Sequence, residues 1–289
     1  MEEKYLTALC AFTYFGPVKT NLLISFFGSG EKTWKAKHKE LLRTGLSENI
    51  VSRFQNHKKY FEFNSYFKRL KRLGIKFITK SSKSYPPNLL DLEDAPPVVY
   101  VKGEITGADV NSVAIVGTRN LTSYGYNVTK RFAGELGKLK VTIVSGLALG
   151  IDAVAHESCL TKGGRTIAVL ATGLDIITPF SNRNLAEQIV KNGALISEYP
   201  LGYPVYKSSY PQRNRIISGL SKAVIVIEAK IQSGTFHTVN AAIKQGREVF
   251  ALPGNVTSPM SEGTNYLIQN GANVAISPED IFYYLQMKK

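Results

Sequence analysis

Short apolar runs recur along residues 98–289, and segments of helical length separate them. Several runs contain four or five consecutive apolar residues, as strands buried on both faces of a sheet require. Alternation of such strands with helices such as Tyr126–Leu139 and Leu185–Asn192 is typical of a parallel, doubly wound sheet, so we predict an α/β fold here. The predicted strands are Val98–Val101, Ser112–Val116, Thr142–Val144, Thr166–Leu170, Ala194–Ser197, Ala223–Glu228 and Glu248–Leu252.

The first 80 residues have a helical pattern. The apolar segments Tyr5–Phe15 and Val18–Phe27 are separated by a Gly-Pro turn, and further short helical segments follow. We predict a small all-helical domain over residues 1–80 and a sheet domain over residues 81–289. The prolines of residues 84–97 interrupt regular structure, so this stretch is expected to be an ordered connecting strap.

Residues 52–83 intersperse many Lys and Arg residues with Tyr and Phe. One interpretation is a basic surface with aromatic platforms for nucleic-acid bases. The other is an amphipathic helix with aromatic rings inward and lysines outward. Phe63, Phe67 and Leu70 fall at helical spacing, which favours the second interpretation.

The composition limits what the chain can be. With 44% hydrophobic residues it can bury a core, and no run of 18 apolar residues is present to span a membrane. Cys10 and Cys159 form no CxxC pair, and the N-terminus has no secretion signal, so we expect a cytoplasmic protein. The net charge of +14 indicates a polyanionic partner, although a well-solvated basic protein without one would have the same charge.

Glycine-containing turns follow five of the predicted strands. In parallel sheets ligands bind outside the carboxyl ends of the strands, where glycine lets backbone amides approach an anion. The first turn adds Arg119, whose guanidinium can grip a phosphate. Together these turns predict a groove for a phosphate-bearing ligand. Their glycines are Gly117, Gly146, Gly173, Gly234 (after Ser233) and Gly254.

A dense basic segment, residues 206–217, joins two predicted strands. Lys207 can pair with a phosphate, and Tyr210 offers a ring on which a base can stack. Arg213 and Arg215 could instead be structural and pair with carboxylates such as Glu198 or Glu228. We expect Lys207 and Tyr210 to bind the ligand and Arg215 to support the fold.

Several catalytic signatures are missing. The chain contains no GxxxxGK[ST], no HExxH and no strict GxGxxG after an apolar run, so neither a P-loop ATPase nor a standard dinucleotide enzyme is indicated. Asp152 and His156 stand four residues apart, which favours a local hydrogen bond at a helix start over a metal site. We expect no metal and no cofactor.

Five segments resemble the DNA-processing protein A family, also called DprA or Smf. They follow the family's order and cover essentially all of residues 98–277. The segments are VAIVGTRNLTSYG, VSGLALGIDAVAHESCL, TIAVLATGLDIITPFSN, YPQRNRIISGLSKAVIVIEAKIQSGTFHT and GREVFALPGNVTSPMSEGTNYLIQNGA.

The resemblance implies an extended Rossmann fold preceded by a sterile-alpha-motif-like helical domain. It also implies a non-enzymatic protein of natural transformation that binds and protects incoming single-stranded DNA and helps to load a RecA-type recombinase. Homodimerisation through the C-terminal part of the Rossmann domain, near Tyr266, Leu267 and Ile268, belongs to the same expectation. The chain stops at Lys289, so we expect no C-terminal winged helix.

The family's binding positions map onto the first glycine turn and the basic segment. Thr118 stands where relatives usually have serine, and Tyr210 replaces the usual phenylalanine and keeps the stacking face. Phe180 occupies a position at which some relatives carry lysine, and Arg183 could substitute for it. The residues predicted to bind DNA are Gly117, Thr118, Arg119, Gly146, Arg183, Lys207, Tyr210, Ser233 and Gly234.

Two other classes of function remain open. Glu228, followed by Ser233-Gly234-Thr235, is similar in outline to Rossmann enzymes that hydrolyse nucleoside monophosphates, although a second glycine is missing. This makes a nucleotide-binding protein or phosphoribohydrolase-like enzyme the alternative. A protein attracted to membrane surfaces by charge alone is the third possibility.

Overall fold

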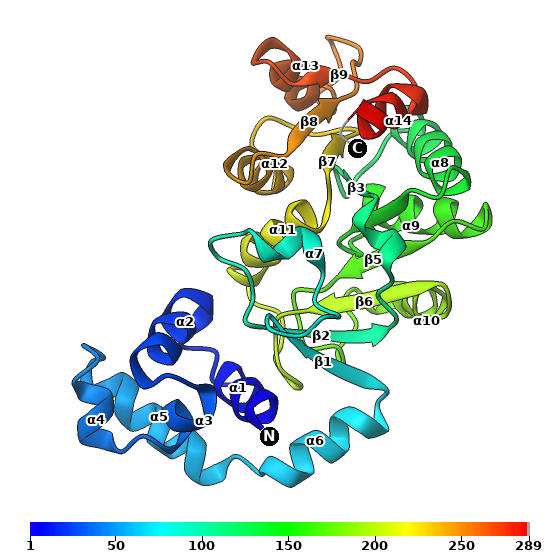
Figure 1. The fold of residues 1–289 in the computed structure, drawn as a ribbon. Coiled ribbons are helices and arrows are strands. Elements are labelled where there is room, and N and C mark those ends of the chain that lie inside the picture. The colour runs from blue at the N-terminus through cyan, green and yellow to red at the C-terminus, as the bar shows by residue number, and fades with distance from the viewer. Residues whose placement is uncertain (288–289) are drawn as a thin grey trace.

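The computed structural model describes residues 1–287, and a mostly parallel sheet forms its centre (Figure 1). Within those residues the sheet has nine strands in the order β1-β2-β6-β5-β4-β3-β7-β8-β9. The strands from β6 to β9 in this order run parallel, whereas β2 pairs antiparallel with both β6 and β1. Their bounds are β1 Ile75–Thr79, β2 Val98–Gly103, β3 Ser112–Val116, β4 Thr142–Ser145, β5 Thr166–Val169, β6 Gly193–Ser197, β7 Ala223–Val226, β8 Glu248–Ala251 and β9 Asn273–Val274.

The predicted α/β fold is confirmed, and all seven predicted strands are present. The central strands β3, β4, β5, β6 and β7 are buried at every position, which is why they appear in the sequence as continuous apolar runs. Two further strands, β1 and β9, escaped prediction. β1 is partly exposed, and β9 has two residues, both exposed.

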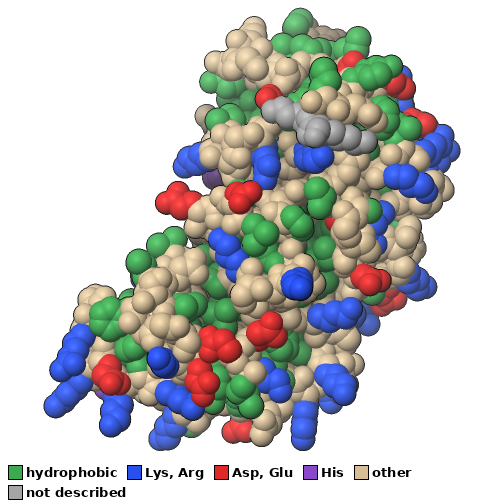
Figure 2. Space-filling view, viewed as in Figure 1, with side chains coloured by type: hydrophobic (Ala, Val, Ile, Leu, Met, Phe, Trp, Pro, Cys, Tyr) green, Lys and Arg blue, Asp and Glu red, His purple; other side chains and the backbone are tan. Residues whose placement is uncertain are grey.

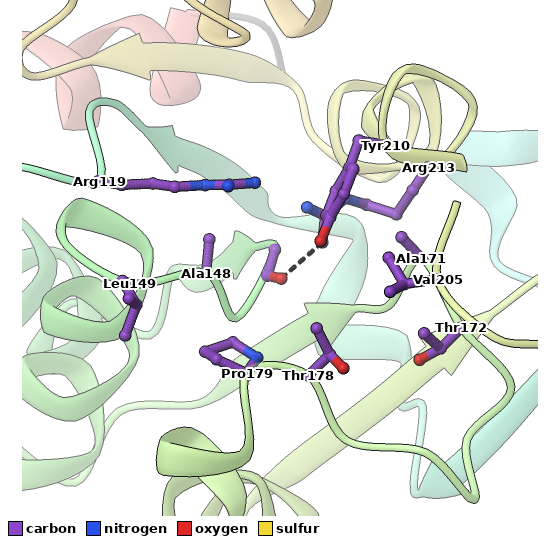
Figure 3. Close-up of a pocket in the computed structure, with 11 residues that line it drawn as sticks. Arg119, Ala148, Leu149, Ala171, Thr172, Thr178, Pro179, Val205, Tyr210 and Arg213 are labelled. Atoms are coloured by element: carbon purple, nitrogen blue, oxygen red, sulfur yellow. Dashed lines mark hydrogen bonds between the residues drawn. The ribbon is translucent and has the colours of Figure 1, made fainter. Parts of the chain in front are cut away.

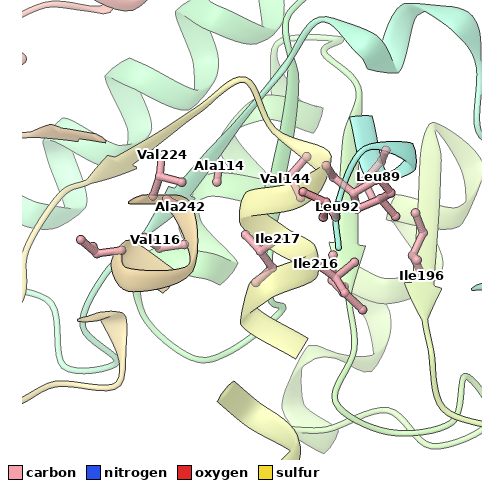
Figure 4. Close-up of a cluster of buried hydrophobic side chains, with 14 of the residues drawn as sticks. Leu89, Leu92, Ala114, Val116, Val144, Ile196, Ile216, Ile217, Val224 and Ala242 are labelled. Atoms are coloured by element: carbon pink, nitrogen blue, oxygen red, sulfur yellow. The ribbon is translucent and has the colours of Figure 1, made fainter. Parts of the chain in front are cut away.

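Helices cover both faces of the sheet (Figure 1). One face packs against α8 Ser123–Lys138, α9 Ile151–Thr161, α10 Arg183–Lys191 and α14 Pro278–Met287. The other face packs against α7 Pro87–Leu90, α11 Ser209–Leu220, α12 Thr235–Lys244 and α13 Glu262–Gln269. Figure 4 shows Ile216 and Ile217 of α11 within the cluster of buried side chains between these helices and the sheet.

The N-terminal region is helical, as predicted. Its helices are α1 Glu2–Cys10, α2 Gly16–Phe27, α3 Gly30–Lys35, α4 His38–Leu42, α5 Glu48–Tyr60 and α6 Phe63–Arg72. The first five of these helices surround a core of their own that includes Leu9, Phe12, Leu41 and Phe54. Figure 2 shows Lys and Arg side chains projecting along the lower edge of the molecule, over this domain.

The chain enters the sheet at Ile75, before the boundary predicted near residue 80. The helix α6 packs onto the sheet domain, because its Leu70 is buried with Ile75, Val98 and Tyr100. The strap of residues 84–97 is ordered, and buried Tyr85 donates a hydrogen bond from its hydroxyl to the carbonyl of Pro96 at 2.7 Å.

The described part of the chain has neither a membrane-spanning helix nor a metal-binding cluster of side chains. No helix there has both the length and the apolar character that crossing a bilayer requires. Between residues 1 and 287, no group of three or more His, Cys, Asp and Glu side chains is placed to hold a metal ion.

The amino ends of the strands are tied together by one buried carboxylate. Asp109, in the short 3-10 helix η1 Gly107–Val110, accepts hydrogen bonds from Arg165 Nε at 2.7 Å and Nη2 at 2.8 Å. It also accepts bonds from Thr142 Oγ1 at 2.9 Å and from the amide of Thr106 at 2.7 Å. These residues lie next to β3, β4 and β5, so Asp109 joins three strands at the edge opposite the carboxyl ends.

We therefore expect Asp109→Ala to lower the free energy of unfolding by about 3 kcal/mol, because it leaves the largely buried Arg165 without a counter-charge. Urea denaturation would measure the loss. The matched control is Glu135→Ala, which removes an exposed ion pair with Lys138 and should cost about 0.5 kcal/mol or less. Equal losses in the two variants would contradict this role of Asp109.

Candidate nucleic-acid interface

Two adjoining hollows lie at the carboxyl ends of the parallel strands, and they share Arg119, Ala148, Tyr210 and Arg213. The larger hollow has a volume of about 460 Å³ and lies between the turn after β3, the start of α11 and the start of α12. The smaller hollow, of about 90 Å³, is bounded by the loops after β4 and β5 and by Val205 (Figure 3).

Most of the predicted binding residues meet at these hollows. Gly146 lines the smaller one. The residues Gly117, Thr118, Arg119, Lys207, Tyr210, Ser233 and Gly234 line the larger one. Thus segments that are far apart in the sequence come together, as the carboxyl-end rule predicts.

Arg119 and Tyr210 form the shared wall. The Arg119 guanidinium carbon lies 5.1 Å from the centre of the Tyr210 ring, and Figure 3 shows the extended arginine pointing toward this ring. Arg119 is exposed and forms no ion pair with any residue between 1 and 287. Its charge is therefore available to a ligand, and Tyr210 keeps a half-buried ring beside it.

Arg213 forms the floor between the hollows and is only 5% exposed. Its Nη1 donates to the carbonyl of Gly146 at 2.5 Å, drawn as the dashed line in Figure 3, and to the carbonyl of Val169. Burial lowers the pKa of the Arg213 guanidinium, and the buried carboxylate of Asp152 counteracts this. Arg213 is thus a structural cation, and the larger share of the charge open to a ligand comes from Arg119 and exposed Lys207.

The expectation of an amide-lined groove needs correction at three positions. The amide of Thr118 donates to the carbonyl of Glu228 at 2.8 Å, and that of Gly146 donates to Asp152 Oδ2 at 3.1 Å. The amide of Ser233 is likewise bonded, to the carbonyl of Lys230. These three amides are occupied inside the protein, so they are not free to bind an anion in the hollows.

Close packing explains the glycines of two turns instead. A Cβ on Gly146 would lie 2.4 Å from Arg213 Nη1, and a Cβ on Gly117 would lie 2.7 Å from Cγ1 of Ile151. Gly173 and Gly254 belong to neither hollow. The amide of Gly173 donates to the carbonyl of Tyr203, and Gly254 packs beside Ser261.

Arg183 lies outside both hollows. It begins α10 with 60% of its side chain exposed, and its Nε lies 3.4 Å from Oε1 of Glu187 in the same helix. Nearby Phe180 is exposed as well. The structure therefore gives Arg183 no contact with the site that the other predicted residues form.

Sequence reasoning missed the far wall of the smaller hollow. Thr172, Thr178 and Pro179 from the loop after β5, with Val205, complete this wall. The same carboxyl-end rule could have found Thr172, because it lies in the turn that follows a predicted strand. Val205 follows no such pattern, since only the path of the loop between β6 and α11 brings it here.

Arg215 and Glu228 both make contacts inside the protein. Arg215 supports the fold, as predicted, because its side chain is 9% exposed and bonds the carboxylate of Glu198. Glu228 makes a different contact: its two carboxylate oxygens accept bonds from the amide of Thr122 at 3.0 Å and from Thr122 Oγ1 at 2.6 Å. It thereby holds Thr122, the N-cap residue of α8, and does not line either hollow.

Local hydrogen bonds do hold the start of α9, because Asp152 Oδ2 accepts the amides of Gly146 and Ala148, but Asp152 and His156 do not bond to each other. His156 Nδ1 instead lies 2.7 Å from Thr166 Oγ1, and that hydroxyl donates to the carbonyl of Ile143. Nδ1 must therefore carry the proton, and among the described residues the buried Nε2 has no partner. Asp152 turns away from His156, toward Gly146 and Arg213.

Comparisons with known proteins give the family of this chain. The family described as DNA recombination-mediator protein A matches residues 76–286. The chain belongs to the DprA/Smf family. It is 41% identical to Protein Smf of Escherichia coli, covering 88% of this chain and 69% of that one, and 44% identical to DNA processing protein DprA of Bacillus subtilis, covering 72% and 71%.

Two solved structures of the family extend the comparison. The crystal structure of DprA from Streptococcus pneumoniae matches with a TM-score of 0.76 and 30% identity, over 98% of this chain and 93% of that one. The structure of DprA from Helicobacter pylori, which concerns its single-stranded DNA binding mode, matches with a TM-score of 0.66 and 33% identity. This second match covers 74% of this chain and 97% of that one. The extended Rossmann-like fold is therefore confirmed.

The buried His156 predicts a specific pH dependence of stability. Burial lowers its pKa from 6.5 to about 3, and the charge of Arg213 acts in the same direction. Between these values the unfolded chain holds more protons, so the stabilisation is complete above pH 6.5 and falls as the pH drops toward 3. We expect the wild type to lose about 2 kcal/mol more than His156→Gln between pH 7 and pH 5 in urea denaturation. Parallel pH profiles of the two proteins would contradict this.

Proposed function

We propose that this chain is a single-stranded DNA-binding protein and that the strand lies across the two hollows. The observation that carries the proposal is the pair formed by Arg119 and Tyr210. An exposed guanidinium with no ion pair among the described residues and an aromatic ring lie side by side between the hollows. Cations for phosphates next to rings for bases are the combination that single-stranded nucleic acid requires.

The charge around the hollows supports an anionic ligand. Arg119, Lys207 and Arg213 line the larger hollow together with one carboxylate, that of Asp152. Lys207 is exposed at the start of the segment that leads into α11, so it can reach a phosphate beside the one held by Arg119. We assign these two residues to phosphates and Tyr210 to a base.

The alternative, a phosphoribohydrolase-like enzyme, loses its candidate carboxylate. Glu228 is 1% exposed and bonded to Thr122, and Asp152 is buried against Arg213. Neither carboxylate is free to act on a ligand in the hollows. We therefore propose a non-enzymatic DNA-binding role.

The wider role follows from the family. We propose that the protein protects incoming single-stranded DNA during natural transformation in the cytoplasm and helps to load a RecA-type recombinase. We further propose that it forms a homodimer through the sheet edge at β9. Exposed Tyr266 and half-buried Ile268 fit the patch expected from the sequence, whereas Leu267 packs into the core. Val274 and Ile276 add exposed apolar surface at this edge.

The decisive experiment titrates fluorescent oligo-dT at several salt concentrations. Each phosphate contact to a single strand contributes about 0.7 to the slope of log affinity against log salt. The double variant Arg119→Ala with Lys207→Ala should bind more weakly and lower this slope by about 1.4. Arg183→Ala is the matched control, because it removes an exposed arginine outside the hollows, and it should leave binding nearly unchanged.

Variants of Tyr210 test the stacking assignment in the same titration. Tyr210→Phe should bind like the wild type, and Tyr210→Leu should lose about 1–3 kcal/mol of binding free energy. Unchanged affinity in the double variant, or release of free base from nucleoside monophosphates by the wild type, would refute the proposed function.

The dimer can be tested in solution by sedimentation. Tyr266→Glu places a charge on the proposed apolar interface, so it should shift the protein from dimer to monomer. The same sample should deliver less recombinase to oligo-dT coated with single-strand-binding protein. Monomeric wild-type protein that nevertheless loads the recombinase would contradict the dimer.

A further inference from the structure

The loop of residues 198–208, between β6 and α11, carries the ligand residues of one side of the site. Val205 lines the smaller hollow and Lys207 the larger one, and Tyr210 follows in the first turn of α11. Before it reaches these positions, the loop passes α6 of the helical domain. The contacts at this crossing connect the two domains directly.

Asp175 is the centre of the crossing. Its carboxylate accepts a hydrogen bond from Arg69 Nη2 of α6 at 2.7 Å. The same carboxylate accepts the amide of Gly202 at 2.9 and 3.1 Å through its two oxygens. The Asp175 side chain is 9% exposed, whereas that of Arg69 is 50% exposed. One residue of the helical domain is therefore bonded, through a nearly buried carboxylate, to the loop that carries Lys207.

Tyr66 of α6 makes a second contact with the same loop. Its hydroxyl donates to Oη of Tyr100 at 2.9 Å and lies 3.4 Å from the amide of Leu201. The adjacent Gly202 has a φ of +77°, which a residue with a side chain rarely adopts, so the loop turns sharply at this point. Tyr66 and the Asp175 carboxylate, which Arg69 bonds, thus accept two successive amides of this turn.

The contact also reaches the smaller hollow from its other side. Asp175 lies in the loop after β5, whose residues Thr172 and Thr178 line that hollow. Within the same crossing, the amide of Gly173 donates to the carbonyl of Tyr203 at 3.0 Å. The loop after β5 and the loop before α11 are therefore joined to each other and to α6 at one place.

We propose that Arg69 and Tyr66 are positioning residues of the single-stranded DNA site. By holding residues 201–202 and Asp175, they keep Lys207 and Tyr210 in the arrangement that a strand meets. The inference rests on the proposed function and assigns the helical domain a part in it. When this contact is lost, the loop has more conformations. DNA binding then becomes weaker, because it must also order the loop, which costs conformational entropy.

A competing explanation would make α6 a direct phosphate contact. Its exposed Lys68, Lys71 and Arg72 surround Arg69, and a polyanion would be attracted to all of them. The two explanations differ at Asp175. Removing its negative charge strengthens DNA binding if charge alone acts, and weakens binding if the carboxylate holds the loop.

The experiment measures oligo-dT affinity of the full chain carrying Asp175→Asn, with Asp91→Asn as the control that removes an exposed carboxylate elsewhere. We expect Asp175→Asn to weaken binding about threefold, and Asp91→Asn to leave it unchanged or slightly tighter. The salt slope should stay at the wild-type value in Asp175→Asn, because no phosphate contact is removed. Wild-type or tighter affinity in Asp175→Asn would overturn the proposal.

The part played by α6 is tested by comparing two variants that each remove one positive charge from this helix, Arg69→Ala and Arg72→Ala. Arg69→Ala should weaken binding about threefold, Arg69→Lys should recover part of the loss, and Arg72→Ala should have a smaller effect. Equal losses in Arg69→Ala and Arg72→Ala, with a reduced salt slope in both, would support direct phosphate contact and overturn positioning. Tyr66→Phe removes one hydroxyl and keeps the ring, so it should weaken binding even if an aspartate variant fails to fold.

Arg119→Ala is measured alongside to separate the two proposals. If Arg119→Ala binds oligo-dT as the wild type does, the proposed function fails. If Arg119→Ala loses affinity while Asp175→Asn and Tyr66→Phe do not, the site is correct and the positioning role is refuted. Thermal unfolding of each variant confirms that the compared proteins are folded.

Discussion

A buried guanidinium holds the carboxyl edge of the sheet together. Arg213 of α11 donates to the carbonyls of Gly146, after β4, and Val169, at the end of β5, while Asp152 of α9 supplies the opposite charge. Burying a guanidinium costs several kcal/mol unless its donors are satisfied, so these loops have to lie where their carbonyls meet it. Tyr210 lies one turn before Arg213 in α11. The contacts that fix Arg213 therefore also position the Tyr210 ring beside Arg119.

The other charges of the sheet domain show how few groups remain for a ligand. Arg165 is neutralised by Asp109, Arg215 by Glu198, and Glu228 is bonded to Thr122, the N-cap residue of α8. Arg119 and Lys207 differ from these because they are exposed at the hollows and, within residues 1–287, take part in no ion pair. The positive character of the site thus comes from two side chains, while the protein satisfies its internal charges locally.

Residue patterns predicted the strands and the grouping of the site because both depend on periodicity and chain direction. A buried parallel strand must be apolar throughout, and parallel strands must present their carboxyl ends at one edge. The weakly patterned β1 and β9 escaped for the opposite reason. β1 is partly exposed and both residues of β9 are exposed, so neither has the continuous apolar run of a buried strand. The resemblance predicted Arg183 because some relatives carry lysine at the nearby position of Phe180. In the structure Arg183 begins α10, and its side chain lies next to Glu187 of the same helix.

The sequence by itself determined the α/β architecture, the helical N-terminal region and the meeting of Arg119, Lys207 and Tyr210, since local pattern and connectivity are enough for these. Only the tertiary structure decided which polar groups are free. Thr118, Gly146 and Glu228 look available in the sequence, yet all three are hydrogen-bonded inside the protein. Thr118 and Glu228 bond to residues distant in the chain, and Gly146 bonds to Asp152. The packing of segments against one another determines which hydrogen-bond partners a buried group meets. Neither composition nor residue spacing shows which segments come into contact.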